Sequence, residues 1–238
     1  MRLLGLAVAV VFGALSVSCS GDKSSVSDSA LAIKTPDRVE GPAASAATAP
    51  ATDSRRTVLF LGTSLTAGLG LDPDSAYPQL IQRKIDASSL PYQVVNAGVS
   101  GETSAGLLRR LDWVLQRPAD VIVVETGAND GLRGIPVSSV RETVSGVLTR
   151  IRRARPNATL ALVQMEAPTN FGAQYTSAFH EMFGAVAKEQ GAVLLPFLLD
   201  SVAGYPRLNQ ADGIHPNSVG EQIVAENVWR GLKPLLAR

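Results

Sequence analysis

The stretch Val58-Leu59-Phe60-Leu61-Gly62-Thr63-Ser64-Leu65 determines how the rest of this 238-residue chain is interpreted. Its four leading apolar residues predict a strand that is buried on both faces. The polar residues that follow predict a turn that exposes a serine at the carboxyl end of this strand. A serine hydroxyl in such a turn is a nucleophile when a base takes its proton, and otherwise it is an ordinary helix N-cap. Ser64 therefore needs a partner elsewhere in the chain.

The histidines supply a candidate for that partner, because the chain contains only His180 and His215. His215 closes Asp212-Gly213-Ile214-His215, and an Asp three residues before a His can orient the imidazole and stabilise the imidazolium. The alternative is a plain turn in which Asp212 bonds only backbone groups. His180 lies in a helical pattern, and we interpret it as a surface or half-buried helix residue. Ser64, Asp212 and His215 together predict a Ser-His-Asp hydrolase.

Short apolar runs alternate with longer amphipathic segments in the rest of the chain. The runs predict strands at Val58–Leu61, Gln93–Asn96, Val121–Glu125, Leu160–Gln164 and Ala192–Leu195. Their near-continuous apolar character predicts that all five are buried on both faces. The segments predict helices at Tyr77–Ala87, Ala105–Leu115, Ser139–Ala154, Tyr175–Gln190 and Ser218–Leu236. Thr103 and either Ser138 or Ser139 are the expected N-caps of the second and third helices. This alternation indicates a doubly wound α/β fold with about five mainly parallel strands and helices on both faces.

Polar and Gly-rich clusters follow the predicted strands, at Gly62–Ser64, Asn96–Gly101 and Gly127–Asp130, and Asp212 follows the last strand. Ligands of such sheets bind beyond the carboxyl ends of the strands, so these segments are expected to converge on one rim. Acyl transfer also needs hydrogen-bond donors for the developing oxyanion. The side chain of Asn129 and the backbone N–H groups of Gly101 and Ser64 are the candidates. As alternatives, Asn129 and Gly101 are ordinary turn residues.

The first 19 residues predict an export signal. A positive start is followed by the apolar run Leu3–Val17 and then by Ser18-Cys19, which fits a secretory signal and is short for a membrane span. Cys19 is the only cysteine, so no intramolecular disulfide can form. Its position resembles a bacterial lipoprotein cleavage site, which implies an acylated Cys19 and a periplasmic or cell-envelope protein anchored at the membrane. An ordinary signal peptide and a retained membrane helix are the alternatives.

The remaining chain divides into a tether and one folded domain. Residues 20–56 are rich in Ser, Ala, Thr and Pro without apolar periodicity, which predicts a disordered segment. Residues 57–238 carry 16 Lys and Arg against 16 Asp and Glu, which argues against nucleic acid as a partner. The one basic cluster, Arg150–Arg155, falls at a predicted helix end. The glycines after Gly62 do not match a nucleotide loop, and one His with one Asp supplies too few metal ligands. We therefore expect neither a cofactor nor a metal.

Four ordered blocks resemble the SGNH hydrolases, also called the GDSL esterase/lipase family. These blocks are Gly62-Thr63-Ser64-Leu65, Asn96–Gly101, Gly127-Ala128-Asn129-Asp130 and Asp212–Asn217. The resemblance extends from Val58 to the carboxyl terminus. It implies a flavodoxin-like sheet, a metal-free Ser-His-Asp mechanism, and an oxyanion hole formed by Ser64, Gly101 and Asn129. Thr63 departs from the family, which usually has Asp there; from the sequence alone we expect Thr63→Asp to be tolerated.

Within the family, three further segments look most like the bacterial thioesterase I, lysophospholipase and arylesterase branch. They are Asp130–Gly134, Asn170-Phe171-Gly172 and Leu194–Phe197. This likeness implies small acyl esters or thioesters as substrates, lysophospholipids among them. The apolar loop residues expected to contact the acyl chain are Leu132, Ile135, Pro168 and Phe171. A carbohydrate deacetylase with the same triad, and a surface-tethered binding protein without catalysis, remain as alternative functions.

Overall fold

The computed structural model describes residues 55–237. The predicted signal segment with Cys19, almost all of the predicted tether, and Arg238 lie outside the described residues. The five strands are β1 (Arg56–Gly62), β2 (Tyr92–Gly98), β3 (Val121–Val124), β4 (Thr159–Gln164) and β5 (Val193–Phe197). The longer helices are α2 (Tyr77–Ala87), α3 (Ser104–Val114), α5 (Val137–Ala154), α6 (Ala173–Gln190) and α7 (Ser218–Leu236). These ten elements correspond to the ten predicted from the sequence.

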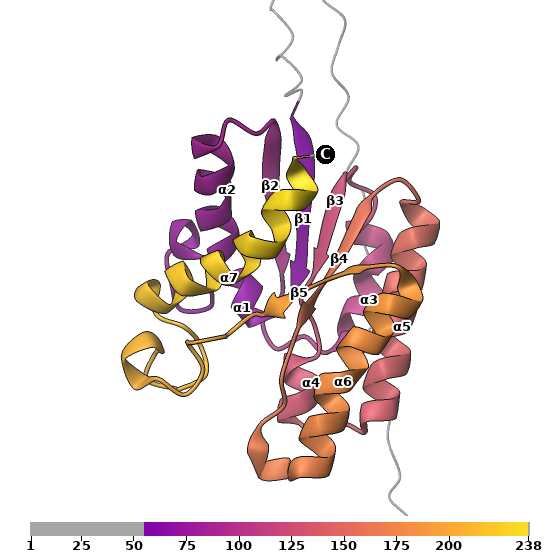
Figure 1. Cartoon of the computed structure of the whole chain (residues 1–238), viewed down its shortest axis with the longest axis vertical. Coiled ribbons are helices and arrows are strands. Elements are labelled where there is room, and N and C mark those ends of the chain that lie inside the picture. Colours follow the sequence, from indigo (N-terminus) through magenta and orange to yellow (C-terminus); the bar gives the residue numbers. More distant parts are fainter. Residues whose placement is uncertain (1–54, 238) are drawn as a thin grey trace, which may run out of the picture. The chain divides into compact units, whose positions relative to one another are not determined.

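The five strands form one parallel sheet in the order β2-β1-β3-β4-β5 (Figure 1). This arrangement confirms the predicted doubly wound α/β class. The chain adds β2 on one side of β1 and then adds β3, β4 and β5 on the other side. The direction of strand addition therefore reverses between β1 and β3. Connections leaving the carboxyl ends of β1 and β3 turn to opposite faces, which opens a crevice at this edge of the sheet.

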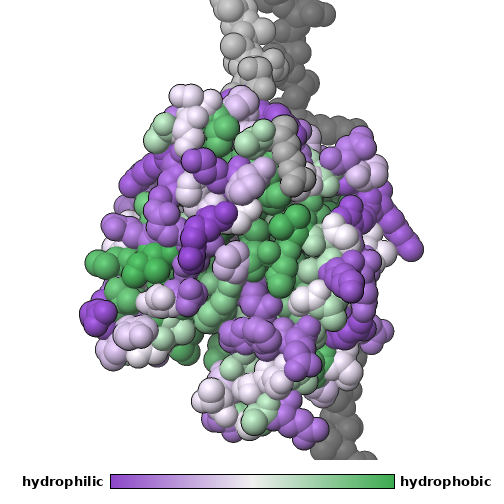
Figure 2. All heavy atoms as spheres, viewed as in Figure 1, coloured by the Kyte–Doolittle hydropathy of each residue, from purple (hydrophilic) through white to green (hydrophobic). Residues whose placement is uncertain are grey.

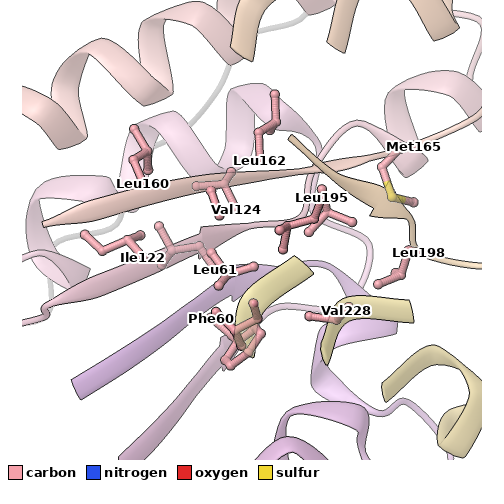
Figure 3. Close-up of a cluster of buried hydrophobic side chains, with 14 of the residues drawn as sticks. Phe60, Leu61, Ile122, Val124, Leu160, Leu162, Met165, Leu195, Leu198 and Val228 are labelled. Atoms are coloured by element: carbon pink, nitrogen blue, oxygen red, sulfur yellow. The ribbon is translucent and has the colours of Figure 1, made fainter. Parts of the chain in front are cut away.

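Helices cover both faces of the sheet. Helices α2 and α7 pack together on one face, and α3, α5 and α6 pack side by side on the other (Figure 1). The sheet's apolar side chains fill the space between these layers, and Figure 3 draws several of the core side chains, among them Phe60 of β1, Leu162 of β4 and Val228 of α7. The three central strands are almost wholly buried, as their uninterrupted apolar sequences predict. Among residues 55–237 no helix is long and apolar enough to cross a membrane.

The two edge strands differ from the prediction that all five are buried on both faces. Residues of β2 are mostly half-buried, and Val193 and Leu194 of β5 are 37% and 41% exposed. Figure 2 shows apolar residues gathered near the middle of one face, over β5. The reason is topological: an edge strand lacks a neighbour on one side, and the helices do not fully cover it. An apolar run in the sequence indicates a strand but does not reveal its place in the sheet.

The helix ends confirm one predicted cap and contradict another. The Thr103 side chain accepts from the N–H of Gly106 and caps α3 as expected. The prediction for α5 was wrong, because this helix begins at Val137 after Pro136 and places Ser138 and Ser139 inside its first turn. The Pro136 carbonyl accepts from the N–H groups of Ser139 and Val140, so the helix starts two residues before the predicted Ser139.

Arginines of the Arg150–Arg155 cluster donate hydrogen bonds to the carboxyl ends of neighbouring helices. Arg152 donates to the carbonyls of Gln190 and Gly191 at the end of α6, and Arg155 donates to the Leu115 carbonyl at the end of α3. Cations are favourable at the carboxyl ends of helices, where carbonyls lack partners. The cluster therefore ties α5 to the two helices beside it.

Candidate active site

Ser64 lies where β1 ends, at the first residue of α1 (Ser64–Ala67). This helix has only four residues, too few to show a period in the sequence, and so it was not predicted. The Thr63 hydroxyl accepts from the N–H of Leu65 at 3.4 Å, and Gly68 ends the helix with a φ of 72°. The Ser64 side chain is thereby held at the carboxyl edge of the sheet, and the residue is 8% exposed.

The loop before α7 brings His215 to this serine. His215 Nε2 lies 2.8 Å from Ser64 Oγ, although 151 positions separate the two residues. The Nδ1 atom of the same ring lies 2.6 Å from Asp212 Oδ2. The loop is fixed by the N–H of Gln210, which donates to the His215 carbonyl at 2.7 Å, and by Gly213, whose φ of 70° favours glycine. The structure thus brings together all three residues that the sequence singled out.

The electrostatics of Asp212 determine which ring nitrogen carries the proton. Backbone N–H groups of His215 and Ile214, then the imidazole, hold the pKa of Asp212 at about 2. An ionised carboxylate only accepts hydrogen bonds. The Nδ1 atom of His215 must therefore donate, which leaves Nε2 as the acceptor of the Ser64 O–H. This is the tautomer that a general base needs.

The two other predicted oxyanion donors lie in adjoining segments at the same edge. Gly101 has a φ of 75°, and an added Cβ would meet nothing within 4 Å, so the space on the side where a side chain would point is open. Asn129 lies in α4 (Ala128–Leu132), and its Nδ2 donates to the Glu102 carbonyl at 3.0 Å. Among the described residues, the N–H groups of Ser64 and Gly101 donate to no protein acceptor. They are available to a ligand.

A cavity of about 310 Å³ is lined by Leu65, the residue after Ser64, and by Gly213 and Ile214 of the loop that carries His215. Leu132 and Pro168, two of the four predicted substrate contacts, line it. Ile135 and Phe171 do not: the Ile135 carbonyl accepts from Tyr175, and the Phe171 ring packs near Gly134. Further lining residues, none of which was predicted to contact the acyl chain, are Leu65, Met165, Phe197, Leu199, Ala203 and Ile214. Most of this lining is apolar.

Two other features lie apart from the triad. A groove of about 470 Å³ runs between β2 and α3, and no residue of the triad lines it. His180 lies on α6 with its side chain 62% exposed, and its Nδ1 is 2.6 Å from Glu166. Within residues 55–237, no three His, Cys, Asp or Glu side chains gather as metal ligands. His180 is thus a surface helix residue, as predicted.

One buried group near the serine escaped the sequence analysis. Glu125 follows β3 directly and is 0% exposed, and its carboxylate contacts Thr63 and Thr66, the residues on either side of the Ser64-Leu65 pair. In the sequence it appears only as the last residue of an apolar run. Nothing in that position indicates that its side chain turns toward β1.

A parallel doubly wound sheet with a hydrogen-bonded serine, histidine and aspartate beyond its strand ends is the arrangement of a serine hydrolase. The comparisons with known proteins agree with this class. The model of the GDSL-like Lipase/Acylhydrolase family matches residues 60–223. The chain therefore belongs to this family, as its four blocks predicted, and it is an enzyme that hydrolyses ester bonds.

Individual relatives cover the folded part of the chain. Esterase TesA of Pseudomonas aeruginosa is 39% identical over 183 residues, which span 76% of this chain and 90% of that protein. Thioesterase 1/protease 1/lysophospholipase L1 of Escherichia coli K12 is 37% identical over 181 residues, spanning 76% and 85%. The solved structure of esterase EstA from Pseudoalteromonas sp. matches with a TM-score of 0.72 at 34% identity, covering 77% of this chain and 100% of that one.

Proposed function

We propose that this protein is an exported serine esterase and thioesterase that hydrolyses small acyl esters or thioesters through Ser64, His215 and Asp212. The observation that carries the proposal is the continuous chain of contacts from Ser64 Oγ to His215 Nε2, at 2.8 Å, and from His215 Nδ1 to Asp212, at 2.6 Å. A serine without such a base is a weak nucleophile.

The proposed reaction has two halves. His215 Nε2 takes the proton of Ser64, whose oxygen attacks the acyl carbonyl, while the N–H groups of Ser64 and Gly101 and the Asn129 amide hold the oxyanion. The imidazolium then protonates the departing alcohol or thiol, which leaves an acyl group on Ser64. Water, deprotonated by His215, attacks this acyl-enzyme, and the imidazolium returns the proton to Ser64 Oγ as the acid leaves. Asp212 stays ionised throughout and stabilises each imidazolium.

The cavity supports an acyl chain as the group that is bound. Its walls include Leu65, Met165, Phe197 and Ile214, and burying a methylene group against such side chains stabilises binding by about 0.8 kcal/mol. A carbohydrate deacetylase would need polar groups for sugar hydroxyls, and Glu166 is the one charged residue of the lining. The names of the relatives include esterase, thioesterase and lysophospholipase activities. Lysophospholipids are therefore candidate substrates here.

The location of the enzyme is part of the proposal. The apolar run Leu3–Val17, followed by Ser18-Cys19, supports export to the cell envelope, with an acylated Cys19 as the anchor and residues 20–56 as the tether. One acyl chain binds membranes only marginally, so at least two should be attached. Cys19→Ala should move the protein out of the membrane fraction and leave its turnover unchanged. A mature wild-type protein without lipid, seen by mass spectrometry, would refute the anchor.

The catalytic proposal is tested by hydrolysis of p-nitrophenyl acetate and p-nitrophenyl octanoate. We expect the protein to hydrolyse both and to prefer the longer chain in kcat/KM, because the apolar cavity binds it. Ser64→Ala should remove most of the activity on both esters. Near-wild-type turnover in Ser64→Ala would end the assignment of the nucleophile, and a preference for acetate would favour the deacetylase.

A further inference from the structure

A single buried carboxylate lies behind Ser64. It accepts hydrogen bonds from the turn that carries this serine. Glu125 accepts from the backbone N–H of Thr63 at 2.7 Å and from the Thr63 hydroxyl at 2.9 and 3.1 Å. The Thr66 hydroxyl donates to the same carboxylate at 2.9 Å. The carboxylate thus holds two residues of the turn, one before Ser64 and one after it.

The turn needs such support because it has little stability of its own. Helix α1 contains only four residues, and helices this short do not persist without tertiary contacts. Both ends of α1 are tied to Glu125, through Thr63 at the N-cap and Thr66 in the helix. The Thr63 hydroxyl also accepts from the Leu65 N–H at 3.4 Å, so the cap and the carboxylate form one network.

Gly62 shows how closely the carboxylate approaches the backbone. A Cβ at this position would lie 1.9 Å from the Thr66 hydroxyl oxygen and 2.7 Å from Glu125 Oε2. Only a glycine leaves room for this approach. The first glycine of the serine block is therefore required by the buried side chains behind the serine, since its own φ needs no glycine.

The groups around Glu125 are arranged as donors. The Tyr77 hydroxyl lies 2.8 Å from the Thr66 oxygen, so a chain of O–H groups can run from Tyr77 through Thr66 to Glu125. Burial raises the pKa of Glu125, and the hydrogen bonds from Thr63 and Thr66 oppose that rise. Hydrogen bonds to a charged acceptor are about twice as strong as neutral ones. An ionised Glu125 would hold the turn most firmly.

We infer that Glu125 is a positioning residue for ester hydrolysis, because its carboxylate fixes the turn that aims the Ser64 hydroxyl at His215. The same turn presents the Ser64 N–H to the oxyanion, so one anchor serves both functions of this residue. Glu125 does not contact the reacting atoms; it acts through Thr63 and Thr66. The inference rests on the proposed role of Ser64.

Glu125→Gln tests the inference, because it replaces one acceptor oxygen with an NH₂ group that faces donors. We expect kcat to fall by about 10- to 100-fold with KM close to wild type, as for a small misplacement of a reacting group. Rates are compared at a temperature where circular dichroism shows each protein folded. Glu221→Gln is the matched control: Glu221 is equally buried and accepts from the Tyr77 N–H, but not from the turn. Its kcat should stay near wild type.

Thr66 gives a second test that does not depend on the folding of Glu125→Gln. Thr66→Ser keeps the hydroxyl and should keep most of kcat, whereas Thr66→Val has nearly the same shape, lacks the hydroxyl and should lose turnover. Wild-type kcat in folded Glu125→Gln, or equal losses in the Ser and Val variants, would overturn the positioning role. An inactive wild-type protein would instead refute the proposed function, and the positioning role, which rests on that function, would fall with it.

Discussion

Asp212 holds His215 through both its side chain and its backbone. One carboxylate oxygen accepts the N–H of His215 at 3.0 Å, while the other lies 2.6 Å from the ring Nδ1. The pKa of Asp212 falls from 3.8 to about 2, mainly because the backbone N–H groups of His215 and Ile214 donate to its carboxylate. Its stabilising interactions are therefore present above about pH 4 and are lost as the pH falls through 2. At any ordinary assay pH, Asp212 is ionised and only accepts.

Asp212→Asn should abolish most of the turnover without unfolding the protein. An amide NH₂ facing Nδ1 favours the tautomer with its proton on Nε2, which cannot take the Ser64 proton. We expect kcat to fall by about 10,000-fold. Asp200→Asn is the control, because Asp200 forms a surface ion pair with Arg230 outside the triad. Comparable losses in both variants would argue against a specific role for Asp212.

Thr63→Asp should destabilise the protein in a pH-dependent manner. The Thr63 hydroxyl lies 2.9 Å from a Glu125 oxygen in a site that is 1% exposed at Thr63, so an Asp would face a buried carboxylate. Two such groups cannot both ionise, and the pKa of one must rise. The carboxyl group with the raised pKa is protonated in the folded protein. Its contribution to stability is full below about pH 4 and is lost as the pH rises through the raised pKa, so the variant is least stable at high pH.

The measurement for Thr63→Asp is thermal unfolding at pH 5 and pH 8, with wild type beside it. We expect a larger loss of Tm at pH 8. Thr63→Ser keeps the hydroxyl and should unfold with nearly the same pH dependence as wild type. An equal shift of Tm at both pH values in Thr63→Asp would show that Glu125 and the new carboxylate do not share a proton.

Glu221→Gln should stabilise the protein at neutral and alkaline pH. Burial raises the pKa of Glu221 from 4.5 to about 8. The folded state then keeps a proton that the unfolded state releases, so stability is full below pH 4.5 and declines up to about pH 8. The decline is at most about 1.4 kcal/mol per pH unit. Urea unfolding measures the free energy of unfolding, and its change between pH 5 and pH 8 should be smaller for the variant than for wild type. Equal changes in the two proteins would contradict the prediction.

Ala203→Phe should shorten the acyl chains that the enzyme accepts. Ala203 lines the cavity and is itself exposed, so a larger side chain fills the space without crowding the core. We expect kcat/KM for p-nitrophenyl octanoate to fall while that for the acetate changes little. Ala87→Phe, an exposed change at the far end of α2, is the control. A parallel decrease for both esters in Ala203→Phe would mean that the cavity does not bind the chain.

The order and type of the main elements could be predicted because each has a local signal. The uninterrupted apolar run Val58–Leu61 marks a central strand, and the bounds predicted for Tyr77–Ala87 and Ser218–Leu236 agree with the helices found. The short helices that carry Ser64 and Asn129 lacked such a signal, since a helix of one turn has no periodicity. The exposure of β2 and β5 could not be predicted either, because it depends on which strands lie at the edges.

By itself, the sequence determined the fold class and the triad candidates, because strand and helix periods and the Asp212–His215 spacing are local properties of the chain. Only the tertiary structure decided the contacts between distant segments. The 2.8 Å approach of His215 to Ser64 and the carboxylate of Glu125 behind the nucleophile both depend on which strands become neighbours. Because Glu125 lies beside Thr63 in the folded protein, we now expect Thr63→Asp to destabilise it, although the sequence alone led us to expect that the change is tolerated.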